Sequence, residues 1–327
     1  MKKRTKRKTH KKQHFVAQCY MKAWVAPESR GKPDIEPYVW TFRRDGSDAS
    51  RKSPKNIFVE TDIYTIPGQD DDRDLRLEHG LQELEDVFTR IRNLTLSKGK
   101  WPNAEQIQWL LIFVAASQIR SRSFRDHSRA QWGNLRKAME DIEVKMCSSI
   151  SETRAASKAL LPPVPESSHR GMTLDEVKKY EQFPVQTMIG PLISVMTRSF
   201  IKMNLAVLES DDSIGFITTD HPCTWFDPEA YKLPPMYRSP TLRSRTVEIT
   251  MPISPTQCLM ISHAEHMRGF MQVNQEAVDI LNHRHIGHCS ASFISRTSTI
   301  RPSWFEVLEP PEDSWEKVTN TSRNSGS

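Results

Sequence analysis

The amino-acid sequence predicts an α+β fold, in which a helical middle is flanked by β-rich N- and C-terminal segments. Between residues 75 and 94, apolar residues recur every three or four positions, which is the spacing of an amphipathic helix. Before residue 67 and after residue 203, short runs rich in β-branched and aromatic residues favour strands instead. Strands and helices that are segregated along a chain are typical of α+β proteins, and the two β-rich ends could form one sheet.

The N-terminal segment contains two predicted strands. Residues 38–42 form the first, because a run of aromatic and β-branched side chains is followed by a turn signal at residues 43–46. Residues 56–66 form a second strand-like stretch, which Pro67-Gly68 ends. We therefore expect β structure ahead of the first helix.

Capping residues mark the helices of the middle segment. The amphipathic helix over residues 75–94 ends before a Lys-Gly-Lys sequence. Asn103, with Gln106 three residues later, predicts the start of a second helix that runs past Ala130. Residues 107–116 of this helix have little polar interruption, so we expect it to be central and buried.

A change of composition interrupts the helical middle. Residues 150–172 are rich in Ser, Pro and Ala, which predicts a mobile connector. Thr173 and Glu176 then form a second capping box that opens a further helix. Another helix is predicted from Val185 to about Lys202.

The C-terminal segment is again β-rich. Strands are predicted over residues 205–208, 214–219, 247–251, 258–262 and 291–295, with one short helix over residues 273–283. The last residues are acidic and then rich in Ser and Asn, which predicts a loose tail over residues 311–327. The sequence thus predicts a single domain over residues 13–310, between this tail and an N-terminal arm of residues 1–12.

The N-terminal arm is strongly basic and contains no acidic residue. Dense charge of one sign predicts that the arm is disordered when no partner is bound. The formal net charge of the whole chain is +6, which is less than the charge of the arm, so the rest of the chain is slightly acidic. The basic residues of the arm are Lys2, Lys3, Arg4, Lys6, Arg7, Lys8, Lys11 and Lys12.

An arm of this kind binds nucleic acid or another polyanion by neutralising phosphates and releasing counterions. Two other roles fit the same composition, namely a solubility tail and weak binding to anionic lipid. We expect nucleic acid or another polyanion to be the partner, and we expect no membrane partner.

Composition and motifs argue against several other classes of protein. The five cysteines are odd in number and widely spread, and no Cys-x-x-Cys pair occurs, which predicts reduced thiols in a cytoplasmic protein. The longest apolar run, residues 109–116, is too short to span a bilayer. The sequence lacks a Gly-rich phosphate loop, a Gly-x-Ser-x-Gly motif, a His-Glu-x-x-His motif and a dinucleotide fingerprint.

His14 opens the predicted domain directly after the arm, and Gln18 and Tyr20 follow it. A neutral imidazole can act as a base, a metal ligand or a phosphate contact. If this segment is helical, His14 and Gln18 share a face. The alternative is a histidine that packs in the core or caps a helix.

Asp220 follows the end of a predicted apolar strand and precedes His221 and Pro222. A strand end fixes a carboxylate while the loop exposes it, so Asp220 is a candidate base or metal ligand. The alternative is an Asx turn, in which Asp220 binds its own backbone.

Glu78 and Glu85 lie seven residues apart on the first predicted helix and so face the same side. Two carboxylates on one face could bind a divalent cation such as Mg²⁺ or Mn²⁺, although such pairs also form solvated stripes. Residues 283–289 contain three histidines and a cysteine, but their spacing matches no common zinc site.

Gln118, Arg120 and His127 lie toward the end of the second predicted helix, where Arg120 and His127 would share a face. An Arg followed a few residues later by a His resembles the short motif of HEPN-type ribonucleases. In those enzymes the Arg stabilises phosphate charge and the His acts in general acid–base catalysis. The alternatives are a cationic helix end that complements the helix dipole and a non-catalytic phosphate-binding face.

Several motifs in the same order resemble the domain of unknown function 4238 family. The segment from His14 to Trp24 is similar to the opening of that family, except that Ala17 stands where Pro is usual. The other matching positions are Glu60-x-Asp62-Ile63-Tyr64, Glu78 with Glu85, Gln118-x-Arg120, residues 216–222, residues 251–255 and Leu281-Asn282. The resemblance spans residues 14–297, and at His221 it departs from the usual Asn or small residue.

The resemblance implies a mostly bacterial, cytoplasmic, single-domain protein and supplies no reaction. It also implies that certain side chains are the polar anchors of the family. These are His14, Asp62, Glu85, Gln118 and Asp220.

Together, these observations support the hypothesis that the protein acts on nucleic acid as a nuclease of a defence or toxin type. The arm would hold phosphate, and His14 would be a general base or ligand. Asp220 and Glu85 would be ligands or acid partners, and Arg120 would stabilise transition-state charge. The alternative is a non-enzymatic nucleic-acid-binding or protein-interaction module whose polar anchors are structural.

Overall fold

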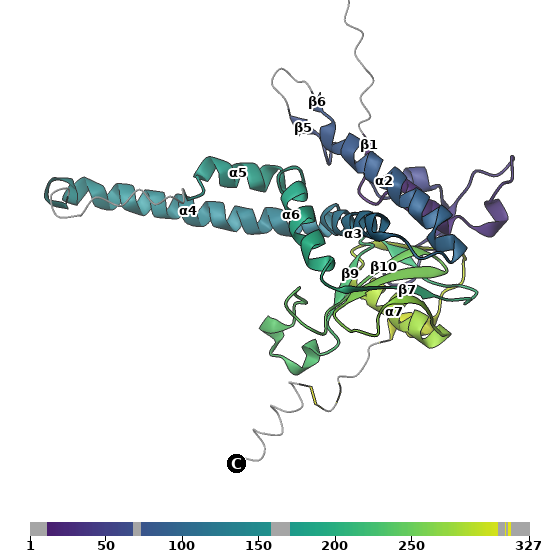
Figure 1. Ribbon diagram of the computed structural model, residues 1–327. Coiled ribbons are helices and arrows are strands. Elements are labelled where there is room, and N and C mark those ends of the chain that lie inside the picture. Colours follow the sequence, from purple (N-terminus) through teal and green to yellow (C-terminus); the bar gives the residue numbers. More distant parts are fainter. Residues whose placement is uncertain (1–11, 68–72, 158–170, 307–310, 312, 315–327) are drawn as a thin grey trace, which may run out of the picture.

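The computed structural model describes residues 12–67, 73–157, 171–306, 311 and 313–314, and it confirms the predicted α+β fold. In Figure 1, β-sheets and the helices packed on them form a body, from which α4 and α5 extend as a long helical hairpin. Helices occupy the middle of the chain and strands lie toward both ends, as the sequence predicts.

Strands from the C-terminal half form a five-stranded sheet with the order β12-β7-β11-β10-β9. Its strands are β7 (Asn204–Glu209), β9 (Thr224–Phe226), β10 (Glu248–Ser254), β11 (Gln257–Ser262) and β12 (Gly269–Gln272). Neighbouring strands are antiparallel except for β12, which runs parallel to β7. The sequence did not predict β9 or β12, which are the two edges of this sheet.

A four-stranded sheet with the order β3-β2-β13-β8 joins the two ends of the chain. Its strands are β2 (Val39–Arg43), β3 (Ser50–Lys52), β8 (Thr218–Thr219) and β13 (Ser292–Ser295). Phe293 pairs with Phe42 on one side and with Thr219 on the other, and the two phenyl rings stack with centroids 5.1 Å apart. The β-rich ends therefore share this sheet, while most C-terminal strands form the other.

Two small sheets and a short helix complete the N-terminal part. β1 (Lys12–His14) pairs with β4 (Val59–Thr61), and β5 (Ile66–Pro67) pairs with β6 (Arg73–Asp74). The helix α1 (Gln18–Met21) follows β1. The predicted strand over residues 56–66 is broken, because Phe58 and Asp62 have positive φ angles that extended strands do not adopt.

The helices α2 (Arg76–Leu94) and α3 (Ala104–Ile119) form the centre of the molecule with α6 (Pro184–Phe200). The predicted capping box of Asn103 and Gln106 is present at the start of α3. Phe88 of α2 stacks on Phe113 of α3 with ring centroids 3.8 Å apart, and both side chains are fully buried. The expectation of a central, buried second helix is confirmed.

The second predicted helix does not run past Ala130, however, because it ends at Ile119 and a new helix, α4 (Arg122–Ser157), begins after a short break. Ser121 causes this break, since its hydroxyl accepts from the Phe124 backbone N–H at 3.2 Å and so caps the start of α4. The predicted connector over residues 150–172 is also too long, because α4 includes residues 150–157. Residues 158–170 lie outside the described residues.

The hairpin is closed by α5 (Leu174–Gln182), which begins with the predicted capping box of Thr173 and Glu176. Trp132 of α4 stacks on Tyr180 of α5 with ring centroids 4.7 Å apart. No helix in the described part of the chain is both long and apolar enough to cross a membrane.

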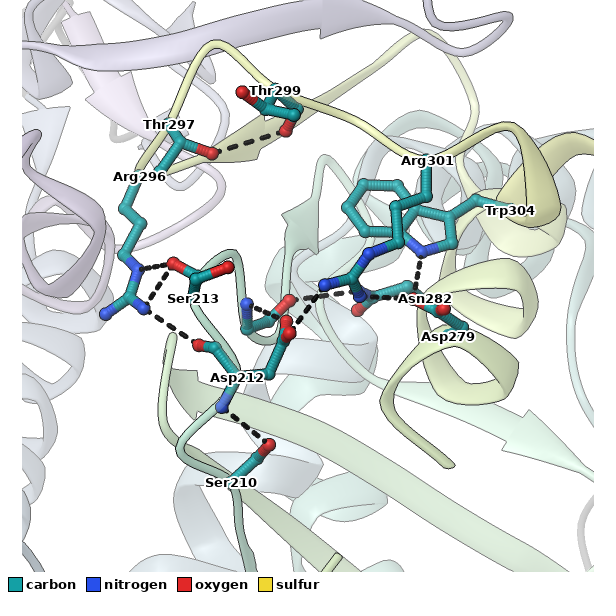
Figure 2. Close-up of polar contacts among 11 residues, drawn as sticks. Ser210, Asp212, Ser213, Asp279, Asn282, Arg296, Thr297, Thr299, Arg301 and Trp304 are labelled. Atoms are coloured by element: carbon teal, nitrogen blue, oxygen red, sulfur yellow. Dashed lines mark hydrogen bonds and ion pairs between the residues drawn. The ribbon is translucent and has the colours of Figure 1, made fainter. Parts of the chain in front are cut away.

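The last helix, α7 (Gln275–His288), is tied to the segments on either side of it. Figure 2 shows Arg301 between two carboxylates. Its Nη2 lies 2.5 Å from Asp212 Oδ1, and its Nη1 lies 2.7 Å from Asp279 Oδ1. Trp304 Nε1 donates to the same Asp279 oxygen at 2.6 Å. These contacts fix the loop after β7 and the segment after β13 onto α7.

The predicted strand over residues 214–219 is shortened to β8 by the same loop. Gly215 has a φ of +75°, and the Phe216 N–H donates to the Pro255 carbonyl at 2.8 Å. A Cβ atom on Gly215 would lie 2.0 Å from that carbonyl oxygen, so only glycine fits.

We therefore expect Gly215→Ala to lower the free energy of unfolding by about 2–4 kcal/mol. The added methyl group would strain the left-handed backbone and overpack the contact with the Pro255 carbonyl. Gly31→Ala is the matched control, because Gly31 has a φ of +73° but no atom within 4 Å of the added Cβ. Urea unfolding of both variants measures the difference. Equal losses would mean that the Pro255 contact does not restrict this position.

Candidate functional site

Three of the four predicted catalytic residues come together at the C-terminal end of α3. Arg120 is the C-cap of this helix and is only 3 % exposed. Its Nη1 lies 2.8 Å from Glu85 Oε1 of α2, and its Nη2 donates to the backbone carbonyl of His14 in β1 at 2.8 Å. We call these residues, with Tyr64 and Cys19, the Arg120 cluster.

Tyr64 completes the surroundings of the Arg120 guanidinium. The Arg120 Nε donates to the Tyr64 hydroxyl at 3.0 Å, and that hydroxyl donates to the His14 carbonyl at 3.1 Å. Burial alone would lower the pKa of Arg120, but Tyr64 and Glu85 outweigh burial and raise this pKa. The guanidinium is thus charged, and each of its three nitrogens has a partner within the protein.

Cys19 lies beside the Glu85 carboxylate, with its Sγ 3.7 Å from Oε2. Burial and the nearby negative charge of Glu85 raise the pKa of the Cys19 thiol to about 11. The thiol is therefore protonated near neutral pH and is not a ready nucleophile. No local pattern connects Cys19 with Glu85, because the two residues are 66 positions apart along the chain.

The His14 imidazole is half-buried, and its Nε2 lies 3.3 Å from the Pro54 carbonyl. Burial is the main cause that lowers the pKa of His14, so the ring is neutral near pH 7. A neutral ring that donates from Nε2 to Pro54 keeps Nδ1 as an acceptor. The neutral His14 ring could therefore accept a proton at Nδ1.

Asp220, the fourth predicted catalytic residue, does not join the Arg120 cluster. It is 7 % exposed, and its carboxylate accepts from the backbone N–H groups of Ser290, Ala291 and Ser292 at 2.9, 2.7 and 3.4 Å. No contact within the described residues links this carboxylate to His14. Asp220 is neither the exposed carboxylate nor the local Asx turn of the sequence analysis, since it holds the start of β13, about 70 residues later.

Gln118 contacts the residue next to Asp220. His221 Nε2 lies 3.0 Å from Gln118 Oε1, and His221 Nδ1 lies 3.3 Å from Ser123 Oγ. Burial, followed by repulsion from His288, lowers the pKa of His221 to about 4. A neutral His221 therefore joins the loop after β8 to the junction between α3 and α4.

The other predicted supporting residues are dispersed. Tyr20 is 1 % exposed, and its hydroxyl contacts Thr218 Oγ1 at 2.6 Å and the Pro252 carbonyl at 2.5 Å, so it is a core anchor. Gln18 is the first residue of α1 and is half-buried. Asp62 has a φ of +58° and accepts from the Thr65 hydroxyl at 3.1 Å.

His127 is separated from Arg120 by the break between α3 and α4. Arg120 is buried at the end of α3, whereas His127 is exposed on α4. The expectation that these two side chains share a helix face is wrong, so the Arg and His do not form the face that the HEPN-type motif requires.

Glu78 and Glu85 both face the N-terminal segment, as their spacing predicts, but they bind different side chains. Glu78 Oε2 accepts from Gln13 Nε2 at 2.8 Å. Gln13 is 2 % exposed, and its Oε1 also accepts from the Tyr64 N–H at 2.7 Å. No local pattern identifies Gln13 as an anchor, because its partners lie 51 and 65 residues away.

Within the described residues, no three His, Cys, Asp or Glu side chains are grouped so that they could hold a metal ion. In the histidine-rich segment, His285 is fully buried and its ring nitrogens lie 2.9 Å from Thr224 Oγ1 and 3.3 Å from Thr250 Oγ1. Burial lowers the pKa of His285 to about 3, so it is a neutral core histidine.

Most of the basic arm, from Lys2 to Lys11, lies outside the described residues. Lys12 is exposed and begins β1, where it pairs with Thr61. The arm is therefore continuous with the strand that carries Gln13 and His14.

A family model described as "Protein of unknown function (DUF4238)" matches residues 12–299. The chain belongs to this family. The resemblance noted in the sequence is thus confirmed. The DUF4238 match begins at β1 and ends just after β13, so it includes both the Arg120 cluster and Asp220 with its partners. No curated protein and no solved structure matches the chain.

We expect Arg120→Met to lower the free energy of unfolding by about 3–5 kcal/mol, because the Glu85 carboxylate would lose the charge that compensates its burial. Arg122→Met is the matched control, since Arg122 is 49 % exposed in its pair with Glu60 and should cost about 0–1 kcal/mol. Urea unfolding measures both variants. Adding Glu85→Gln to Arg120→Met should recover part of the lost free energy of unfolding. Equal losses in Arg120→Met and Arg122→Met would contradict a buried cross-link at Arg120.

Proposed function

We propose that this protein binds nucleic acid or another polyanion through its basic arm, and that its buried polar residues are structural anchors. The observation that carries the proposal is the junction of the arm with the body. Eight Lys or Arg residues among the first twelve lead directly into β1, where Gln13 is buried and hydrogen-bonded to Tyr64 and Glu78. The root of a cationic segment is thereby held in one place.

The Arg120 cluster supports this proposal because its contacts bind the residues that follow the arm to the body of the protein. Arg120 and Tyr64 both donate to the His14 carbonyl, so the residues after the arm are bound to α3 and to the loop after β4. A guanidinium that is 3 % exposed and bonded on all three nitrogens would have to break these contacts to bind a phosphate. The cluster is better suited to hold the arm than to stabilise transition-state charge.

A nuclease of a defence or toxin type is the second candidate function, and the neutral, half-buried His14 imidazole favours it. In that case His14 would be the general base, and Mg²⁺ or Mn²⁺ would have to be held in part by the substrate phosphates. A cytoplasmic location belongs to both proposals and is supported by the free thiols of Cys19, Cys223, Cys258 and Cys289.

Neutralising the arm should weaken binding and flatten its salt dependence. In the test variant, Gln replaces the seven basic residues that precede Lys12. We expect the slope of log binding constant against log salt concentration to fall by up to about 5 for a single strand. Fluorescence anisotropy with a labelled oligonucleotide from 50 to 200 mM salt measures both changes, and deletion of residues 2–11 is the companion variant. Unchanged affinity and slope in both variants would remove the arm from the binding surface.

Catalysis is tested by incubating the protein with RNA and DNA, with and without Mg²⁺ or Mn²⁺, beside His14→Ala and Asp220→Ala. If the anchors are structural, we expect no cleavage that His14→Ala abolishes. Asp220→Ala should instead lower the free energy of unfolding by about 1–3 kcal/mol, because buried backbone N–H groups would lose their acceptor. Metal-dependent cleavage that His14→Ala removes without a change in melting temperature would establish the nuclease.

A further inference from the structure

The connection between β9 and β10 is a long, ordered excursion from the edge of the five-stranded sheet. Phe226 of β9 and Glu248 of β10 are paired in the sheet, yet about twenty residues lie between them. In Figure 1 the excursion is the green segment at the lower left, which projects away from the sheet below β9. We call residues 228–246 the β9–β10 loop.

Asp227 closes the base of this loop. Asp227 is 9 % exposed, and its carboxylate accepts from the Ser244 hydroxyl at 2.5 Å, the Thr246 hydroxyl at 2.7 Å and the Glu229 N–H at 3.0 Å. The two limbs of the loop are therefore joined at one buried side chain. A loop fixed in this way is preorganised, so it loses little conformational entropy when it binds a partner.

The tip of the loop exposes large apolar side chains. Met236 is 79 % exposed, Tyr237 is 65 % exposed and Leu233 is 42 % exposed. The backbone that carries them is fixed, because the Tyr237 N–H donates to the Pro234 carbonyl at 2.9 Å and the Arg238 Nε donates to the Leu233 carbonyl at 2.9 Å. An aromatic ring exposed to this extent on an ordered turn is available to stack on a partner.

The second limb of the loop carries cations that face away from the base. Exposure alternates along residues 241–246, so Ser244 and Thr246 face Asp227 while Arg243 and Arg245 are exposed. Within the described residues, neither of these arginines has an ion-pair partner or a side-chain hydrogen bond. In the sequence, the loop contains four basic residues and one acidic residue, Glu229, so it carries a net positive charge.

We propose that the β9–β10 loop is a second nucleic-acid contact, which binds a single strand by stacking a base on Tyr237 and holding phosphates with Arg243 and Arg245. Single-stranded nucleic acid fits because an unpaired base offers a face for stacking, whereas the bases of a duplex are already stacked. The excess of positive charge favours a polyanion over a neutral protein partner. The inference rests on the proposed function and adds to it a preference for single strands.

The test compares binding of a labelled 20-nucleotide single strand and of its duplex, by fluorescence anisotropy, to matched variants. Tyr237→Ala should weaken binding of the single strand about tenfold and leave binding of the duplex nearly unchanged, whereas Tyr237→Phe should bind as the native protein does. Arg243→Gln with Arg245→Gln should weaken binding and reduce the salt slope by about 1–2. Arg198→Gln with Lys202→Gln is the control for loss of two exposed charges elsewhere.

The arm-neutralised variant separates failure of this inference from failure of the proposed function. If that variant loses affinity while Tyr237→Ala and Tyr237→Phe bind the single strand equally, the arm is a binding surface and the loop is not. If the native protein binds neither oligonucleotide, both proposals are wrong. If Tyr237→Ala weakens binding only to vesicles that contain phosphatidylserine, the loop is a membrane contact and the inference is overturned.

Discussion

The buried ion pair between Arg120 and Glu85 is the interaction on which the N-terminal half depends. One guanidinium joins the end of α3 to α2, to the Tyr64 hydroxyl and to the backbone of β1. A charge at 3 % exposure is tolerated only if it is paired and hydrogen-bonded, and the three contacts of this guanidinium meet that requirement. These contacts use the N–H donors of Arg120 that a phosphate would need. Arg120 would therefore have to break contacts that stabilise this region in order to act in catalysis.

The C-terminal half uses polar cross-links of the same kind, in which carboxylates and one guanidinium take part. Asp220 holds three backbone N–H groups at the start of β13, and Arg301 joins Asp212 to Asp279 on α7. Asp227 closes the base of the β9–β10 loop in a similar way. In each case polar side chains join segments that are separated along the chain.

In the function that we propose, the buried anchors form the scaffold and other surfaces bind the partner. The buried anchors are paired through their own contacts, whereas the basic residues of the arm and the exposed Arg243 and Arg245 of the β9–β10 loop are the cations that we propose bind an anionic partner. Both surfaces suit an anionic, flexible partner, since the arm supplies charge and the loop adds an exposed aromatic ring. Binding that uses both surfaces would gain from their being carried on one chain.

The sequence by itself determined the α+β class, the start of α3 at Asn103, the start of α5 at Thr173 and the cationic arm. These features depend on periodicity, charge density and hydrogen bonds between residues three apart, all of which are local. Only the tertiary structure decided the break at Ser121, the sharing of one sheet by the two ends, and the separation of Asp220 from His14. Those outcomes depend on contacts such as Arg120 with His14, 106 residues apart, and a linear pattern of residue types does not specify which distant partner a buried polar group will find.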